Sequence, residues 1–373
     1  MNALAIYDEL TARRTRFLRV DELCRMTGEA HPKSLPSEQE LTAEAALPLR
    51  DKKGLEKPQG EFLAQILDDP AAGSHLCHAM LLRRQDSREK FSEFDRRGAL
   101  ELPGVHLERQ GKAAVLTLSN PRYLNAEDET TLDGMEIAVD LALLDPKTEL
   151  CVLRGGPVEH PKYAGRRVFG AGINLTHLYQ GKVRLLWYLI RDLGLVNKLY
   201  RGLAFKEHSP ETAGIEKLWI AAVEGFAIGG HCQLLLTMDY TIAADDAYLT
   251  LPARKEGIIP GAANLRLPRF VGDRLARQAV MAERRLDCAS PEGRMICDEV
   301  VPPGQMDQCL SKTIDKLTGS GIVSAAGNRR AFRVAQEPLD LFRRYMAVYA
   351  REQAHCHFSP ALVSNLEKNW KAS

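Results

Sequence analysis

Apolar residues recur at helical spacing over the first part of the chain. Positions that share a helical face include Leu4, Tyr7, Leu10, Phe62, Ile66 and Leu67. The spacing predicts a helical region over residues 1–98. Within it, a polar and proline-bearing stretch over residues 31–57 indicates a loop, and the charged segment 83–97 predicts a solvated helix.

Short apolar runs alternate with helical spacing in the middle of the chain. Strand-like runs cover residues 113–118, 150–154, 218–223, 240–244 and 247–251. Helical spacing covers residues 130–144, 176–200 and 230–238, and it returns over residues 324–370. Strands that alternate with helices indicate βαβ units and a largely parallel sheet. We therefore predict an α/β protein with a helical N-terminal domain (1–98), a central domain (99–320) and a C-terminal helical segment (321–373).

Composition and charge are those of an ordinary globular chain. The formal net charge is +1, which does not suggest a nucleic-acid-binding protein. No apolar run approaches the roughly 18–20 residues of a membrane span, and the N-terminus meets acidic residues too early for a signal peptide. The eight cysteines are scattered without a Cys-x-x-Cys pair, so we expect reduced thiols and a cytoplasmic location.

Two glycine turns carry the candidate chemistry. The first is Gly170-Ala171-Gly172-Ile173, and the second runs from Gly225 to Gly230. Each follows a strand-like run and leads into helical spacing, where a glycine lets a backbone N–H approach a ligand closely. Two N–H groups aimed at one point form an oxyanion hole, which would stabilise an enolate made from a carbonyl substrate. Plain turn glycines are the alternative explanation.

Other motifs in the chain favour no cofactor site. Residues 170–175 match Gly-x-Gly-x-x-Gly in part, but Leu175 replaces the third glycine and no clear acidic residue closes a following strand. This disfavours dinucleotide binding. The histidines and cysteines at 75–78 and 355–357 lack the spacing of common zinc sites. A Gly-x-Ser-x-Gly elbow is also absent, which disfavours a serine hydrolase.

A set of motifs, in order along the chain, resembles the enoyl-CoA hydratase (crotonase) superfamily. The motifs are Asn120-Pro121, Asn125-Ala126, the Phe169 turn, the Gly225 turn and residues 257–261, and the resemblance covers residues 102–301. It implies a spiral of ββα units with C-terminal helices over the active site, and a homo-oligomer that is a trimer or a dimer of trimers. It also implies that the backbone N–H groups of Ile173 and Gly230 form the oxyanion hole.

The chain departs from the hydratases of this superfamily where they carry two glutamates that handle water. Gln233 occupies the first of these positions, and the second falls near Ala253. Neither an amide nor a methyl group acts as a general base. The chain therefore keeps the oxyanion hole without the hydration residues, which disfavours simple hydration.

Two segments, 172–182 and 187–198, resemble a dioxygenase subfamily of glycopeptide antibiotic pathways, and the helical N-terminal region extends that resemblance. The subfamily converts 3,5-dihydroxyphenylacetyl-CoA and O2 to 3,5-dihydroxyphenylglyoxylate and free CoA, with neither a metal nor an organic cofactor. The resemblance implies these two substrates for the chain, and neither a nucleic acid nor a membrane as a partner. Another acyl-CoA hydrolase or isomerase of the superfamily, or a non-catalytic CoA-binding member, stays open.

The same resemblance implies the remaining site residues. Arg191 and Glu127 would contact the ring hydroxyls or orient the substrate, and Gln233 would hydrogen-bond near Cα. Residues expected along the substrate are His160, Pro161, Lys162, Tyr163, Ala171, Gly172, Asn174, Leu175, Gly229, His231 and Cys232. Three alternatives stay open: Arg191 as a surface charge, Glu127 as a carboxylate at a helix N-terminus, and His160 as a structural histidine rather than a base.

Overall fold

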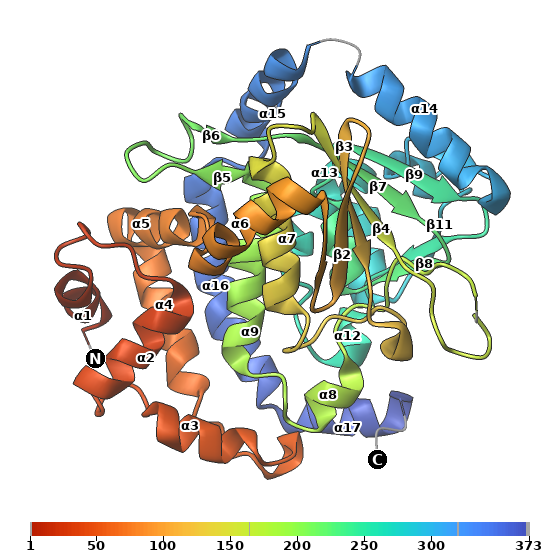
Figure 1. Ribbon diagram of the computed structural model, residues 1–373. Helices are drawn as coiled ribbons and strands as arrows, with labels where there is room; N and C mark the ends of the chain where they lie inside the picture. The colour runs from red at the N-terminus through yellow and green to blue at the C-terminus, as the bar shows by residue number, and fades with distance from the viewer. Residues whose placement is uncertain (1, 164, 319–320, 371–373) are drawn as a thin grey trace.

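A seven-stranded sheet lies at the centre of the protein (Figure 1). The computed structural model describes residues 2–163, 165–318 and 321–370. The strands follow the order β1-β2-β3-β4-β7-β9-β12, with antiparallel pairing from β1 to β3 and parallel pairing from β3 onward. Their bounds are β1 Ala99–Leu102, β2 Val105–Gln110, β3 Ala113–Leu118, β4 Leu150–Gly155, β7 Leu218–Val223, β9 Tyr240–Ala244 and β12 Glu299–Val301.

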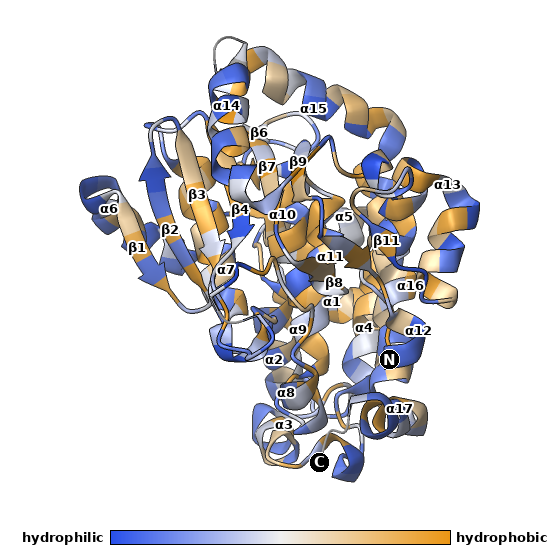
Figure 2. Ribbon diagram, turned by 90° about the vertical axis from the view of Figure 1, so that its right-hand side faces the viewer, coloured by the Kyte–Doolittle hydropathy of each residue, from blue (hydrophilic) through white to orange (hydrophobic). Residues whose placement is uncertain are grey.

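The inner strands of this sheet are buried on both faces. Every residue of β4 is buried, and in β7 only Leu218 is partly exposed. Strands covered on both faces have continuous apolar runs, which is why the sequence pattern identified them. Figure 2 shows the contrast between the largely hydrophobic β3 and the mostly hydrophilic helix α6 beside the sheet edge.

A second, smaller sheet produces the repeating ββα unit. Its strands are β8 Phe226–Ile228, β10 Tyr248–Thr250 and β11 Leu286–Asp287, and a separate pair is formed by β5 Leu203–Ala204 and β6 Gly214–Ile215. The chain passes from β7 in the large sheet to β8 in the small one and then into helix α11. It repeats this step from β9 to β10 and into α12. The predicted α/β class with a spiral of ββα units is confirmed.

Helices flank the sheets from both ends of the chain. The N-terminal helices are α1 Ala3–Leu10, α2 Val20–Ala30, α3 Glu38–Ala45, α4 Lys57–Asp68, α5 Pro70–Leu81 and α6 Gln85–Arg97. The later helices are α7 Leu132–Leu144, α8 Leu175–Tyr179, α9 Leu185–Ile190, α10 Asn197–Arg201, α11 Gly230–Leu235, α12 Ala253–Glu256, α13 Ala263–Met281, α14 Met306–Thr318, α15 Ile322–Gln336, α16 Leu339–His357 and α17 Pro360–Trp370. Short 3-10 turns are η1 Leu49–Asp51, η2 Pro121–Tyr123, η4 Gly293–Met295 and η5 Pro303–Gln305, and a π-helical segment, η3, covers Arg191–Val196.

The two ends of the chain pack on each other through α4 and α16, which lie side by side in Figure 1. Gly60 in α4 makes this approach possible. A Cβ atom at Gly60 would lie 2.5 Å from the Ala354 Cβ and 2.8 Å from the Ala350 carbonyl oxygen of α16. The N-terminal helices therefore share a packed interface with the C-terminal ones.

Two sequence predictions of local structure are wrong. The expected loop over residues 31–57 contains α3, which begins at a Ser37–Glu40 capping box, and η1. The buried Glu44 carboxylate accepts backbone N–H bonds from residues 53–55, which orders the segment. The expected single helix over 176–200 is divided into α8, α9, η3 and α10.

The predicted domain boundaries stay predictions. The first strand, β1, begins at Ala99, directly after the six N-terminal helices. For the boundary predicted between residues 320 and 321, residue 320 lies outside the described residues. All eight cysteines are free thiols, seven of them buried. Within the described part of the chain, no helix combines the length and the apolar character that crossing a membrane requires.

The α4–α16 interface generates a stability prediction. Gly60→Ala is expected to lower the free energy of unfolding by about 1–3 kcal/mol, because the added methyl forces the helices apart. This loss outweighs the gain of up to about 1 kcal/mol that alanine brings to a helix interior. Gly327→Ala in α15 is the matched control, since a Cβ there meets nothing within 4 Å. Denaturant unfolding should show a gain for the control; an equal gain for Gly60→Ala contradicts the prediction.

Candidate active site

The two glycine turns lie side by side. The N–H of Gly170 donates to the Phe226 carbonyl at 3.1 Å, and the N–H of Ile228 donates to the Gly170 carbonyl at 3.0 Å. Gly172 has a φ of +80°, and a Cβ there would lie 2.7 Å from the Ile228 carbonyl oxygen. Only glycine fits this left-handed position at such a close approach.

Two backbone N–H groups are left without an acceptor at this junction. The bridge between Glu127 and Ile173 uses the N–H groups of Glu127 and Asn174, so the Ile173 N–H has no acceptor among the described residues. Gly230 is the first residue of α11, and its N–H likewise has no acceptor among the described residues. Ile173 and Gly230 line the same cavity. The arrangement has the form of an oxyanion hole, whose role stays a prediction.

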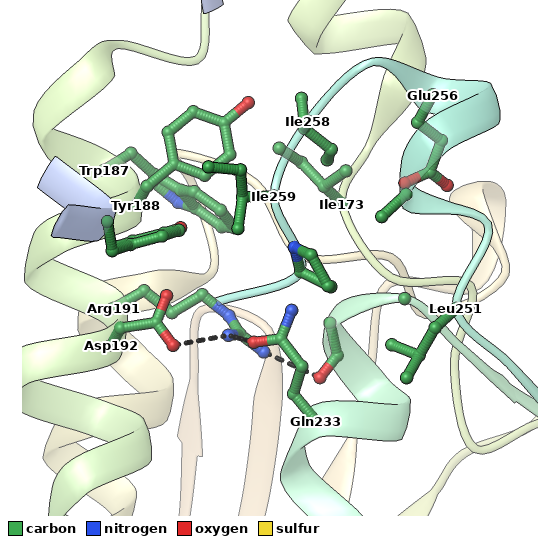
Figure 3. A pocket seen from close by; sticks show the side chains of 15 residues that line it. Ile173, Trp187, Tyr188, Arg191, Asp192, Gln233, Leu251, Glu256, Ile258 and Ile259 are labelled. Atoms are coloured by element: carbon green, nitrogen blue, oxygen red, sulfur yellow. Dashed lines mark hydrogen bonds and ion pairs between the residues drawn. The ribbon is translucent and has the colours of Figure 1, made fainter. Parts of the chain in front are cut away.

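The cavity beside these N–H groups, called the inner cavity below, has a volume of about 30 Å³ (Figure 3). Its lining consists of Ile173, Trp187, Tyr188, Arg191, Asp192, Gly229, Gly230, Gln233, Leu251, Ala253, Glu256, Ile258, Ile259, Pro260 and Tyr349. Apolar side chains form one side, and Figure 3 shows Arg191, Asp192 and Gln233 together at another. Polar groups that converge in an apolar pocket are typical of a binding site for a small molecule.

Arg191 is the central polar group of the inner cavity. Its guanidinium donates from Nε and Nη2 to the two carboxylate oxygens of Glu127, at 2.9 and 2.8 Å. It also donates to Gln233 Oε1 at 2.9 Å and to the Gly230 carbonyl at 2.8 Å. The side chains of Arg191 and Glu127 are only 3% and 2% exposed. The alternatives of a surface arginine and of a simple helix-terminal glutamate are therefore wrong.

Arg191 occupies the start of the π-helical segment η3. A π-helical turn widens the helix and shifts the direction of its side chains relative to an α-helix, and such turns are frequent at functional sites. Arg191 and its neighbour Asp192 both line the cavity as a result. Gly261 lies close to both Gln233 and Asp192: a Cβ atom at Gly261 would be 2.3 Å from Gln233 Oε1 and 2.5 Å from Asp192 Oδ1.

Glu256 is a cavity residue that the sequence analysis missed. It is the last residue of α12 and is 5% exposed. Burial raises the pKa of its carboxyl from 4.5 to about 7, and the nearby Lys255 charge lowers it only in part. Its side chain forms no hydrogen bond or ion pair with any described residue. The signal available in the sequence was its place one helical turn after Ala253, on the same face of a helix.

An outer groove leads from the inner cavity to the surface. It has a volume of about 650 Å³, and among its lining residues are the predicted His160, Ala171, Asn174 and Leu175. Ile173 and Glu256 line both the groove and the inner cavity, so the two spaces meet at these residues. A long ligand can therefore lie along the groove with one end beside the two free N–H groups.

Other predicted residues line neither space. His231 is fully buried, and its Nδ1 accepts the Gly172 N–H at 2.9 Å. Burial lowers the pKa of His231 to about 4, so the ring is neutral and supports the first turn. Cys232 is buried, and Tyr163 packs edge-on against Phe226. Pro161, Lys162 and Gly172 are likewise outside both linings. Glu127, which contacts Arg191, also lies outside both linings. For all seven, a direct role in substrate binding stays a prediction.

One group of side chains has the composition of a metal site. Ligand atoms of Asp128, Glu129 and His177 lie within 4.8 Å of one another. Asp128 already accepts hydrogen bonds from Asn120 and Asn174, and His177 pairs with Glu129 at 2.9 Å. None of the three lines the inner cavity or the groove. These contacts indicate that the three side chains stabilise the loop that carries Glu127.

The buried Glu256 generates a stability prediction. The pKa of Glu256 is about 7 in the folded protein, whereas its ordinary value is 4.5. Between pH 4.5 and 7 the folded state therefore binds more protons than the unfolded state, and its stability falls as the pH rises. Above pH 7 the accumulated cost is roughly 3 kcal/mol. Glu256→Gln removes this cost, so thermal unfolding should show a gain of a few degrees at pH 8 and little change near pH 4.5. An equal shift at both pH values contradicts the assignment.

Comparison with known proteins places this site in a family. The model of the enoyl-CoA hydratase/isomerase family matches residues 108–348. The (3,5-dihydroxyphenyl)acetyl-CoA 1,2-dioxygenase of Amycolatopsis orientalis is 48% identical over 354 residues, which cover 95% of this chain and 81% of that protein. The short-chain-enoyl-CoA hydratase of Clostridium acetobutylicum is 28% identical over 62% of this chain and 82% of its own length.

Solved structures agree in fold. The crystal structure of an enoyl-CoA hydratase from Mycobacterium avium subsp. paratuberculosis superimposes with a TM-score of 0.60 at 19% identity, over 73% of this chain and 97% of that one. An enoyl-CoA hydratase/isomerase from Xanthobacter autotrophicus gives a TM-score of 0.59 at 21% identity, over 73% of this chain and 94% of that one. The fold, the ordered motifs and the family model agree: this chain belongs to the enoyl-CoA hydratase/isomerase (crotonase) family.

Proposed function

We propose that this chain is a dioxygenase that converts 3,5-dihydroxyphenylacetyl-CoA and O2 to 3,5-dihydroxyphenylglyoxylate and free CoA. The observation that carries the proposal is the match to the Amycolatopsis dioxygenase over 95% of the chain. The site supports it, because the cavity combines two free N–H groups with Gln233 and Ala253 where a hydratase needs carboxylates. The product would serve the synthesis of 3,5-dihydroxyphenylglycine for glycopeptide antibiotics.

The two spaces of the site correspond to the two parts of this substrate. The inner cavity lies beside the two free N–H groups and combines apolar walls with polar groups, so it is the space for the dihydroxyphenylacetyl group. Its volume is about 30 Å³, so the lining side chains must move apart to admit the ring. The outer groove takes the CoA chain. The thioester oxygen then lies at the N–H groups of Ile173 and Gly230, where the two spaces meet. Arg191 and Gln233 face the aryl group and supply hydrogen bonds to its hydroxyls.

The chemistry follows from enolate formation. Loss of one Cα proton gives an enolate, and each oxyanion-hole donor stabilises its oxygen by roughly 3 kcal/mol. The enolate, conjugated with the electron-rich ring, passes one electron to O2, and the two radicals combine to a peroxide at Cα. The peroxide attacks the thioester carbonyl and expels the CoA thiolate; breakage of the O–O bond with loss of the second Cα hydrogen gives the α-keto acid.

This route needs neither a metal nor an organic cofactor, which is part of the proposal. The electron donor is the substrate enolate itself, and both oxygen atoms of O2 enter the product. The residues of the inner cavity contribute hydrogen bonds, charge and exclusion of water rather than redox chemistry.

We also propose that the protein acts as a cytoplasmic homo-oligomer, a trimer or a dimer of trimers. Helix α15 exposes Val323, Phe332 and Val334 at 89%, 63% and 77% of their surface. Val323 and Val334 share one face of the helix, while Phe332 lies on the opposite face. Exposed apolar side chains of this size are typical of a surface that another chain covers.

Oxygen uptake tests the function and the absence of a cofactor together. Purified protein, treated exhaustively with EDTA, is expected to consume one O2 and release one thiol for each molecule of 3,5-dihydroxyphenylacetyl-CoA. An oxygen electrode and a thiol reagent measure the two quantities. Activity that is lost with EDTA and restored by iron contradicts the cofactor-free route. Equal thiol release without O2 identifies an acyl-CoA hydrolase instead.

The hydrogen bonds that Arg191 donates to Glu127 and Gln233 lead to a kinetic prediction. Arg191→Lys keeps the charge but donates from a single nitrogen, so it cannot hold both oxygens of Glu127 together with Gln233. We expect kcat/KM for the dihydroxyphenyl thioester to fall by about 10–100-fold, which is the worth of one or two charged hydrogen bonds. Arg277→Lys, in an exposed pair with Asp273, is the control. Unchanged kinetics in Arg191→Lys would remove this residue from substrate orientation.

A further inference from the structure

Glu256 stands at the point where the inner cavity meets the outer groove. It and Ile173 are the residues that line both spaces. Figure 3 shows the Glu256 carboxylate extending from α12 beside Ile173 and Ile258, across the cavity from Arg191 and Asp192. The thioester of the bound substrate lies at Ile173 in the proposed function, so this carboxylate is beside the carbonyl and its neighbouring Cα.

The other acidic groups near the acyl chain do not stand at this junction. Glu127 accepts two hydrogen bonds from Arg191. Asp192 is buried, its Oδ1 lacks a hydrogen-bond partner among the described residues, and burial raises its pKa, but it lines the inner cavity alone, 3.8 Å from the Arg191 Nη1. The two histidines near the turns are unsuited as bases, because His231 is fully buried behind Gly172 and His160 is an exposed residue of the outer groove.

Glu256 is buried and lines both spaces, and its carboxylate forms no hydrogen bond or ion pair with any described residue. The titratable side chains that share one of its two spaces are Arg122, Tyr123, His160, Tyr179, Tyr188, Arg191, Asp192, Lys255, Glu283 and Tyr349. Lys255 is the cation nearest in sequence, and its ammonium lies over the Trp370 ring at 5.5 Å. The Glu256 carboxyl therefore has lone pairs and a proton available to a ligand.

We propose that Glu256 is the general base that removes the Cα proton of the acyl-CoA. The Cα–H bond breaks, its electron pair enters the enolate held by the N–H groups of Ile173 and Gly230, and an O–H bond forms on the Glu256 carboxylate. After the peroxide has expelled CoA, the same proton neutralises the CoA thiolate and restores the carboxylate. The step needs no reagent beyond the acyl-CoA and O2 of the proposed function, on which the inference rests.

The acid–base properties of the site agree with this role. A general base is most effective when its pKa is near the working pH. Burial raises the pKa of Glu256 to about 7, and its carboxylate, which has no partner among the described residues, lines both spaces. A carboxyl at the junction can take a proton from Cα on one side and give it to sulfur on the other.

Hydrogen exchange at Cα tests the base separately from the oxygen chemistry. The full-length protein is incubated anaerobically in D2O with 3,5-dihydroxyphenylacetyl-CoA, and deuterium at Cα is followed by mass spectrometry. Wild-type protein is expected to catalyse exchange. Glu256→Gln should slow it at least about 100-fold, the lower range of a general base's contribution. Glu256→Asp keeps a carboxylate and should recover part of the rate.

Two controls separate a lost base from a lost fold. Glu89→Gln changes an exposed glutamate of α6 and should exchange at the wild-type rate. Binding of a phenylacetyl-CoA ligand by Glu256→Gln, measured by calorimetry, should stay within a few-fold of wild type. Exchange by Glu256→Gln at the wild-type rate, or no exchange by the wild-type protein, overturns the inference. Glu256-dependent exchange without O2 uptake in air overturns the dioxygenase function and leaves the base in place.

Discussion

The buried ion pair between Arg191 and Glu127 is the interaction on which the geometry of the site depends. A charge left unpaired at this depth costs several kcal/mol, so the two side chains constrain each other strongly. The guanidinium also holds the Gly230 carbonyl, while the backbone of Glu127 bonds to Gly172. One pair thus fixes the second glycine turn relative to the first. The spacing of the two free N–H groups follows from it.

Two glutamates near the cavity have opposite environments. Glu127 lies outside the cavity lining and accepts two charged hydrogen bonds from Arg191, whereas Glu256 lines the cavity, is buried and has a raised pKa. Carboxylates separated in this way are suited to separate tasks, one to orient and one to exchange protons. The absence of a carboxylate at Gln233 and Ala253 then removes the residues that would direct water, without removing every base from the cavity.

Sequence patterns predicted the parts of the fold that depend on local chemistry. The strands over 113–118, 218–223 and 240–244 were found because buried parallel strands have continuous apolar runs. The edge strand β1 and its neighbour β2 were missed, because their glutamates interrupt the apolar pattern. Glu256 was missed for a different reason. The resemblance directs attention to position 253, and only the short helix α12 shows that the side chain three residues later enters the same cavity.

The helical N-terminal region belongs to the scaffold of the site. Arg19 of this region bonds Glu136 of α7 at 2.8 Å, and Glu136 in turn pairs with the fully buried Lys198 at 2.8 Å. Burial alone would raise the pKa of Glu136, but the charges of Lys198 and Arg19 lower it to about 2. Lys198 lies directly after the π-helical segment that carries Arg191. The N-terminal helices therefore support, through Glu136 and Lys198, the segment that carries Arg191.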